Sequence, residues 1–145
     1  MNITFVCAAV GKGKNSESYF NEAYAEYEKR LGAFCRVKAV TCGESDSEIL
    51  AAIPKNAYVI ALCVDGRQLS SEELADKLNA IAVAGSSSVA FVIGGSEGFG
   101  EAVRRAADFK LSFSKMTFPH RLMKVILAEQ VYRAFTILNN VKYHK

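Results

Sequence analysis

The clearest fold signal in the chain is the stretch Ser88-Val89-Ala90-Phe91-Val92-Ile93, which runs directly into Gly94-Gly95-Ser96-Glu97-Gly98. Its first part is a nearly continuous apolar run, which is typical of a strand buried on both faces. The glycines that follow would let a ligand approach the backbone closely. No Gly-Lys-Ser/Thr follows them, so the cluster is not a P-loop, and a plain turn from strand to helix explains it equally well.

Strand and helix signals alternate on both sides of this stretch. Further strands are predicted at residues 2–10, 34–41, 57–64 and 109–113, and helices at residues 16–31, 44–53, 101–107 and 119–138. One more helix opens at Ser70-Ser71-Glu72-Glu73, where a serine cap precedes acids in the first turn. This order predicts an α/β fold with a mainly parallel sheet and helices on both faces, in a single domain over residues 1–145.

The composition is that of an ordinary globular protein, with 50% hydrophobic and 23% charged residues. No apolar run approaches the roughly 20 residues that span a bilayer, and the start lacks the basic region of a signal peptide. We therefore expect a cytoplasmic protein with no membrane partner. Its cysteines, Cys7, Cys35, Cys42 and Cys63, have no zinc-ligand spacing, so we expect no metal site and interpret them as small buried hydrophobes.

Charge is spread unevenly along the chain. From Ser112 onward there are six Lys or Arg residues and one acid, Glu129, whereas the remainder has twelve basic and fourteen acidic residues. A basic end on a near-neutral body suits a polyanionic partner. A solvated helix face explains it equally well.

Ligands of such sheets bind at the carboxyl ends of the strands. The candidate loops are those after Val10, Val64, Ile93 and Phe113. In the first loop, Gly11-x-Gly13-x-x-Ser16 lacks the third glycine of a dinucleotide-binding turn, so a tight turn is the better interpretation.

The helix at 119–138 is apolar over most of its circumference, and its polar residues Glu129, Arg133, Thr136 and Asn140 form one stripe. A small domain rarely buries a helix on so many sides, which favours a dimer interface; a central core helix is the alternative. Beyond the helix, Tyr143 and His144 are residue types that bind or move protons. Composition alone nevertheless favours a frayed tail there.

Several of these stretches together resemble the bacterial ribosomal RNA large-subunit methyltransferase H family, which belongs to the SPOUT class of knotted methyltransferases. The matching motifs, in order, are Ala9-Val10-Gly11-Lys12, Glu26-Tyr27-Glu28-Lys29-Arg30-Leu31, Phe91-Val92-Ile93-Gly94-Gly95-Ser96-Glu97-Gly98, Leu111-Ser112-Phe113-Ser114-Lys115-Met116-Thr117-Phe118-Pro119-His120, Glu129-Gln130-Val131-Tyr132-Arg133-Ala134 and Tyr143-His144-Lys145. The resemblance covers nearly the whole chain.

The resemblance implies a homodimer with a trefoil knot near the C-terminus, which sequence physics would not suggest because knots are almost absent among folds. It also implies methylation at N3 of a pseudouridine in a stem-loop of 23S ribosomal RNA within the ribosome, with S-adenosylmethionine as methyl donor and no DNA partner. The cofactor residues carried over by position are Leu62, Gly94, Phe113, Ser114, Lys115, Met116, Thr117 and Phe118. Such a ligand is held mainly by backbone groups and apolar walls.

The sequence departs from the family pattern at two places. Members of the family carry a longer charged insert where this chain has only Cys42-Gly43-Glu44-Ser45-Asp46, which puts RNA contacts by that insert in doubt. They also tend to carry an acid directly after the leucine that ends the third strand, whereas this chain reads Leu62-Cys63-Val64-Asp65-Gly66-Arg67.

The imide proton at N3 must leave during methyl transfer, and His144, His120 and Tyr143 are the candidates to take it or to stabilise the anion. We favour His144 as the base because histidine titrates near neutral pH. Tyr143 would stack on the base or hydrogen-bond to it, and Arg133 and Lys115 would bind phosphate or a base carbonyl, with His120 beside the substrate.

Other interpretations remain open at this point. The chain could be a SPOUT enzyme for another RNA position, a non-catalytic ribosome assembly factor, or a nucleotide-binding regulator that uses the turn at residues 11–16. The Tyr143-His144-Lys145 ending speaks against the first and the intact Gly94-Gly95 against the second.

Overall fold

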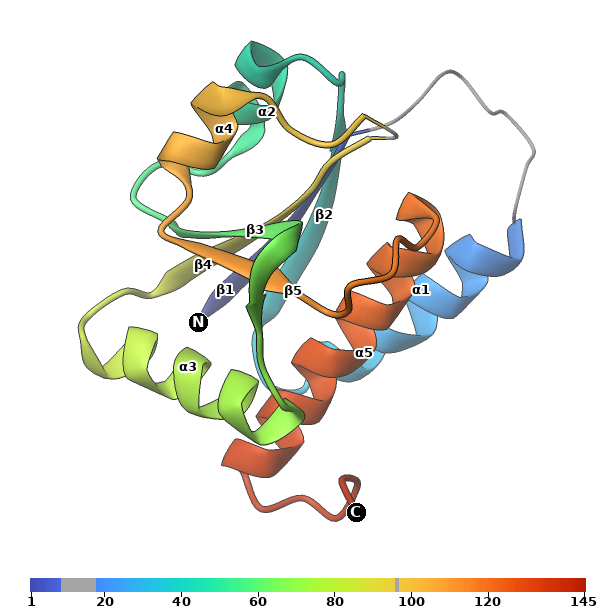
Figure 1. Cartoon of the computed structure of the whole chain (residues 1–145). Helices are drawn as coiled ribbons and strands as arrows, with labels where there is room; N and C mark the ends of the chain where they lie inside the picture. The colour runs from blue at the N-terminus through green and yellow to red at the C-terminus, as the bar shows by residue number, and fades with distance from the viewer. Residues whose placement is uncertain (9–17, 96) are drawn as a thin grey trace.

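The computed structural model describes residues 1–8, 18–95 and 97–145, and the predicted turn at residues 11–16 lies outside them. Strands and helices alternate as expected (Figure 1). The strands are β1 (Asn2–Ala8), β2 (Arg36–Cys42), β3 (Tyr58–Gln68), β4 (Ser88–Ile93) and β5 (Phe109–Ser112), and the helices are α1 (Ser18–Leu31), α2 (Asp46–Ala52), α3 (Ser71–Val83), α4 (Glu101–Ala106) and α5 (His120–Leu138).

The five strands form one parallel sheet in the order β2-β1-β4-β3-β5. β4 lies at its centre, which explains why residues 88–93 give an almost unbroken apolar run: Val89, Ala90, Phe91 and Val92 are all 0% exposed. The α/β fold with a parallel sheet is therefore confirmed. All strand ends of the same kind meet at one edge of the sheet, so the segments after β4 and β5 lie near residues 62–65 of β3.

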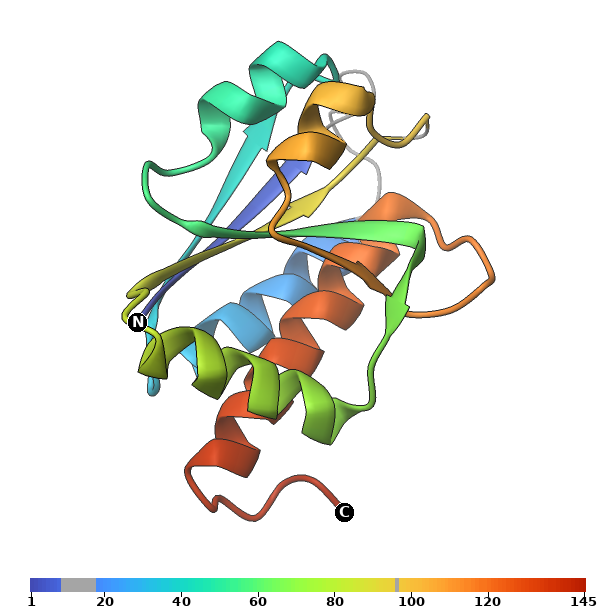
Figure 2. The same ribbon diagram turned by 60° about the vertical axis from the view of Figure 1, so that its left-hand side comes forward.

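Helices cover both faces of the sheet (Figures 1 and 2). α1, α3 and α5 lie on one face, where the larger core includes Ile3, Phe5 and Phe91, while α2 and α4 lie on the other over Val6 and Val92. Successive residues of a strand thus feed two different cores. This two-sided burial is what makes a strand apolar throughout rather than alternating.

The predicted serine cap at Ser70 is confirmed, and a second serine cap lies at the start of α2. Ser70 and Glu73 form a capping box at α3: the Glu73 amide donates to Ser70 Oγ at 3.0 Å and the Ser70 amide donates to Glu73 Oε1 at 2.8 Å. Ser45 caps α2 by accepting from the Glu48 amide at 3.2 Å. Pro119 directly precedes α5, where its missing amide proton costs nothing.

Two predictions from local pattern were wrong. The third strand does not end at Val64 but extends to Gln68, because a second segment of it pairs with β5. The C-terminal tail is not frayed, because Tyr143 and His144 make side-chain contacts with α5 and α3. The knotted path of the C-terminal segment stays a prediction from the resemblance.

α5 lies between α1 and α3 and contributes Leu127, Val131 and Phe135 to the larger core. A core position therefore accounts for one side of this helix, and a dimer interface for the rest stays a prediction. Within the part of the chain that the structure describes, no helix is long and apolar enough to cross a membrane.

Candidate cofactor cavity and C-terminal cluster

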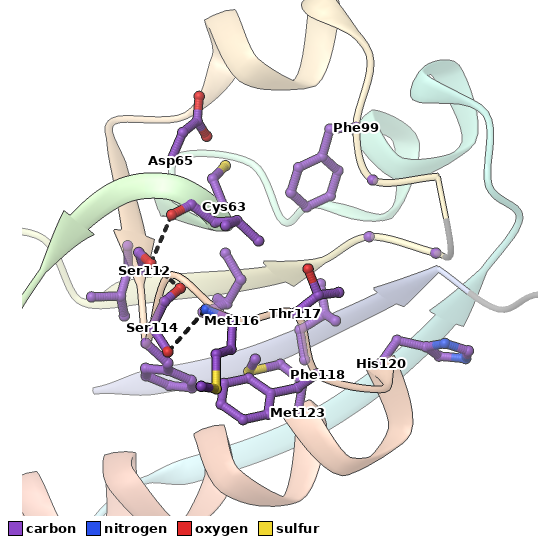
Figure 3. Close-up of a pocket in the computed structure, with 18 of the residues that line it drawn as sticks. Cys63, Asp65, Phe99, Ser112, Ser114, Met116, Thr117, Phe118, His120 and Met123 are labelled. Carbon is purple, nitrogen blue, oxygen red and sulfur yellow. Dashed lines mark hydrogen bonds between the residues drawn. The ribbon is translucent and has the colours of Figure 1, made fainter.

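A cavity of about 380 Å³ lies at the carboxyl ends of β4 and β5 and beside residues 62–65 of β3, next to the first turn of α5 (Figure 3). Its apolar walls come from the strand ends and from the segment before α5, through Leu62, Ile93, Leu111, Phe118 and Met123. This volume falls in the range of roughly 300–1,000 Å³ that is common for small-molecule sites. The rule that ligands bind at strand ends therefore points to the position of this cavity.

One wall of the cavity is an excursion within β3. Leu111 of β5 is in register with both Leu62 and Arg67, so residues 63–66 leave the strand pairing and β3 then resumes it. Cys63, Val64 and Asp65 of this excursion line the cavity. A Cβ atom at Gly66 would stand 2.7 Å from the Lys110 carbonyl oxygen, so glycine is required where the excursion passes β5.

The segment between β5 and α5 forms the opposite wall and is fixed by serine hydroxyls (Figure 3). Ser112 Oγ, which is buried, lies 2.9 Å from the Val64 carbonyl oxygen and 3.0 Å from that of Ser114, and can donate to either. Ser114 Oγ accepts from the Met116 amide at 3.0 Å. These bonds join the segment to the β3 excursion without using the strand ladder.

The glycines after β4 form the third side. Gly98 has φ +75, a left-handed conformation that side chains rarely adopt, and its backbone lies 3.0 Å from where a Cβ of Gly94 would stand. Both conditions favour glycine at these two positions. The loop is also held from a distance, because Asp46 accepts from the amides of Gly100, Ala102 and Val103 at 2.9, 3.0 and 3.2 Å.

An ion pair stands at the rim of the cavity. Arg104 of α4 donates to both oxygens of Asp65, with NH2 to Oδ2 at 2.7 Å and NH1 to Oδ1 at 3.3 Å. The hydrogen bond from Arg104 lowers the pKa of Asp65 and raises that of Arg104. His120 and Glu97 also line the cavity, so its rim carries the Arg104 guanidinium and the carboxylates of Asp65 and Glu97.

Most of the cofactor residues expected from the resemblance line this one cavity: Leu62, Gly94, Phe113, Ser114, Met116, Thr117 and Phe118. Lys115 lies in the same segment but is exposed and does not line it. Cys63, Phe99, Arg104 and Met123 line the cavity without having been predicted. The strand-end rule predicts which loops border the cavity but does not predict α4. Arg104 of this helix reaches the cavity because the helix packs beside residues 63–66 of β3.

Three other predicted residues, Arg133, Tyr143 and His144, form a separate C-terminal cluster that does not line the cavity. Tyr143 Oη donates to Glu129 Oε2 at 2.6 Å, and Arg133 NH2 donates to the same oxygen at 2.7 Å. The Arg133 guanidinium also lies over the Tyr143 ring, 4.8 Å from its centre. Thr136, predicted on the same polar stripe, is instead fully buried and donates to the Arg133 carbonyl at 2.6 Å.

Protons in the C-terminal cluster are constrained. Burial, together with the hydrogen bond to Glu129, holds the pKa of Tyr143 well above the ordinary phenol value, so its hydroxyl stays protonated at neutral pH. Arg133 NH1 lies 3.1 Å from His144 Nδ1, and because arginine only donates, this nitrogen accepts. His144 Nε2 lies 3.4 Å from Glu72 Oε1. In this arrangement His144 Nδ1 can accept a proton from another group only after the Arg133 guanidinium has moved away from it.

Cysteine and metal chemistry have no support within the described residues, where no group of three or more His, Cys, Asp or Glu side chains could hold a metal ion. All four cysteines are free, and burial raises their pKa values, to about 11 for Cys7 and Cys35. Cys63, which lines the cavity, is therefore a thiol at neutral pH.

The cavity fits S-adenosylmethionine in its chemical make-up. Apolar and aromatic walls with close backbone approach at glycines suit a nucleoside, and a rim with both charges suits an amino acid group. Leu62, Gly94 and the segment 113–118 supply the first of these features.

Comparison with known proteins also indicates a methyltransferase. A family model described as "Predicted SPOUT methyltransferase" matches residues 1–144. Proteins named "Ribosomal RNA large subunit methyltransferase H" from Clostridium novyi, Clostridioides difficile and Bacillus pumilus are 44%, 41% and 42% identical, and each alignment covers 100% of both chains. The aligned length of 163 positions exceeds the 145 residues of this chain, so these relatives contain residues that have no counterpart here.

Among solved structures, a probable methylase family protein from Haemophilus influenzae is similar in fold, with a TM-score of 0.51 and 16% identity. The similarity covers 97% of this chain and 66% of that protein. At this identity the comparison supports the fold alone.

Proposed function

Because the chain belongs to the SPOUT methyltransferase family, we propose that it methylates large-subunit ribosomal RNA, at N3 of a pseudouridine, with S-adenosylmethionine as methyl donor. The observation that carries the proposal is the cavity at the ends of β4 and β5 and beside residues 62–65 of β3, which combines apolar walls with a charged rim. Full-length relatives at 41–44% identity, which are named as ribosomal RNA large subunit methyltransferases, support the ribosomal RNA part of the proposal.

S-adenosylmethionine supplies a methyl group activated by a positively charged sulfur. Leu62 and the segment 113–118 would hold its nucleoside, and Gly94 would let the backbone approach it. Holding donor and base in line accounts for most of the acceleration in such a reaction. These residues are therefore binding and orienting groups rather than proton carriers.

The base needs a proton acceptor, because N3 loses its proton as it forms the new bond to carbon. His144 is the acceptor we propose, since the phenol of Tyr143 is already protonated and engaged with Glu129. His144 becomes available when Arg133 turns to the substrate instead, so that Arg133 binds a phosphate or carbonyl oxygen while His144 takes the proton. Tyr143 would stack on the base.

A homodimer would bring these groups to a cavity. Arg133 stands thirteen residues further along α5 than His120, which lines the cavity, and at 1.5 Å per residue this is about 20 Å. The C-terminal cluster of one subunit thus suits the cavity of a second copy better than its own. Each subunit alone should then be inactive.

RNA would be bound through the basic C-terminal quarter of the chain, with Lys115 and His120 beside the cavity mouth. Lys115 is exposed and does not line the cavity, so its ammonium group is placed to contact an RNA phosphate outside the cavity. We expect recognition to depend on the shape of an assembled ribosome.

The test is to incubate the purified protein with methyl-labelled S-adenosylmethionine and ribosomes from a strain that lacks this enzyme. Nuclease mapping and mass spectrometry then locate the label. We expect it on one large-subunit pseudouridine, with little label on free RNA. Label on another nucleotide would overturn the assignment of substrate, and no label together with no cofactor binding would favour the assembly-factor alternative.

The dimer is tested by mixing two inactive variants, one with a blocked cavity (Gly94→Leu) and one without its base (His144→Ala). If the site is shared between subunits, mixed dimers contain one intact site and recover activity. No recovery after subunit exchange would place both groups in one subunit.

A further inference from the structure

The Asp65–Arg104 pair at the rim of the cavity lies outside both hydrophobic cores. It also takes no part in the nucleoside binding and the proton transfer proposed for the other residues. It joins the β3 excursion to α4 across the mouth of the cavity, and Figure 3 shows the Asp65 side chain leaving the excursion toward α4. Local sequence gives no reason for this pair, since the two residues are 39 positions apart.

We propose that Asp65 and Arg104 form a subsite for the amino acid end of the methyl donor, with Arg104 binding its carboxylate and Asp65 its ammonium group. This inference rests on the proposed function and adds the residues that select the charged end of the ligand.

The bonding capacity of the pair supports this subsite. Arg104 has five N–H donors and gives two of them to Asp65, and the Asp65 carboxylate keeps lone pairs beyond those that Arg104 uses. The side chains are 32% and 66% exposed, so the remaining groups are open to a ligand. A second pair on the same helix, Arg105 with Glu101, is 79% and 68% exposed, and neither residue lines the cavity.

The charges on the rim favour an amino acid group over an RNA phosphate as the partner of Arg104. Among the lining residues that the structure describes, Arg104 is the one permanent cation, and Asp65 and Glu97 stand on the same rim. Two carboxylates repel a phosphate backbone, whereas a group with one positive and one negative charge can satisfy both members of the pair.

Two ligands that differ only in this group provide the test. S-adenosylhomocysteine carries the amino acid end and methylthioadenosine lacks it, and calorimetry gives the affinity of each for the full-length protein. In Arg104→Gln we expect S-adenosylhomocysteine to bind about 10- to 100-fold more weakly, as for a lost charge-assisted contact, with methylthioadenosine unchanged. Asp65→Asn should weaken S-adenosylhomocysteine binding in the same selective way.

Arg105→Gln is the matched control, since it removes the neighbouring arginine of the same helix and should change neither affinity. Arg104→Lys, which keeps the charge but not the planar fork, should give an intermediate loss and guards against a folding defect in Arg104→Gln. Equal losses for both ligands, or no loss for either, would overturn the inference. If the wild-type protein bound neither ligand, the proposed function itself would fail.

Discussion

The two ends of α5 carry different kinds of chemistry. At its start, His120 and Met123 border a cavity formed by the ends of β4 and β5 and by residues 62–65 of β3, where glycines and serines set the shape. At its other end, Glu129, Arg133, Tyr143 and His144 form a cluster in which side chains bind side chains. The first is suited to holding a ligand and the second to moving a proton and binding a polyanion.

In the proposed mechanism the two ends of α5 would therefore serve two different tasks, binding of the methyl donor and removal of the proton from the base. The cavity depends on where the chain passes, so substitutions there should act on ligand affinity and fold stability. The C-terminal cluster depends on which functional groups are present, so substitutions there should act on turnover. Each prediction below tests one side of that division.

The largest effect is expected for His144→Ala. Loss of a general base costs on the order of 10²- to 10⁴-fold in rate, while affinity for S-adenosylhomocysteine should stay within about twofold of wild type. Methyl transfer to ribosomes and calorimetry measure the two quantities. Unchanged turnover would remove His144 from the mechanism, and a parallel loss of affinity would break the division between the two ends.

The next effect is expected for Gly66→Ala, on the cavity side. The added Cβ would stand 2.7 Å from the Lys110 carbonyl oxygen, so β5 must shift, which costs roughly 1–3 kcal/mol of unfolding free energy. Urea unfolding measures this cost, and ligand affinity should fall with it. Gly43→Ala is the control, because its Cβ would meet only the flexible carboxylate of Glu48.

A smaller effect is expected for Asp46→Ala, which removes the acceptor for the amides of Gly100, Ala102 and Val103. Loss of such a cap costs about 0.5–2 kcal/mol of unfolding free energy, and the loop after β4 should hold the cofactor less tightly. Asp46→Asn, which keeps one acceptor oxygen, should lie between. Turnover at saturating cofactor should not change, since the C-terminal cluster is untouched.

The smallest effect is expected for Tyr143→Phe, at about 1 kcal/mol of unfolding free energy for one hydrogen bond. Because burial raises the pKa of Tyr143, its contribution is fully present below the ordinary phenol value of about 10 and is lost as the pH rises above it. Stability of wild type and variant should therefore converge in alkali. Glu129→Gln should let the Tyr143 phenol ionise at lower pH, which ultraviolet absorbance measures.

The sequence predicted the fold and the cavity loops because both follow from local patterns. A run such as residues 88–93 gives strand and burial together, and the strand-end rule then indicates the segments after Ile93 and Phe113, which line the cavity. The family resemblance added Ser114, Met116, Thr117 and Phe118, which line the same cavity.

What the sequence could not give depends on contacts between distant segments. β3 extends to Gln68 because Leu111 of β5 pairs with both Leu62 and Arg67. Arg104 reaches the cavity because α4 packs beside the β3 excursion. The ordered tail likewise depends on Glu129 and Arg133, which satisfy Tyr143 and give residues 143–144 a partner that composition does not reveal.

The β3 excursion has a consequence for how a ligand enters and leaves. Residues 63–66 have no register partner in β5, while the strand is paired with β5 immediately before and after them. Their amides can therefore exchange with solvent hydrogen without any opening of the sheet, whereas those of residues 59–62 should exchange only by larger unfolding. We therefore expect this wall of the cavity to open locally, which lets a ligand enter or leave while the rest of the sheet stays paired.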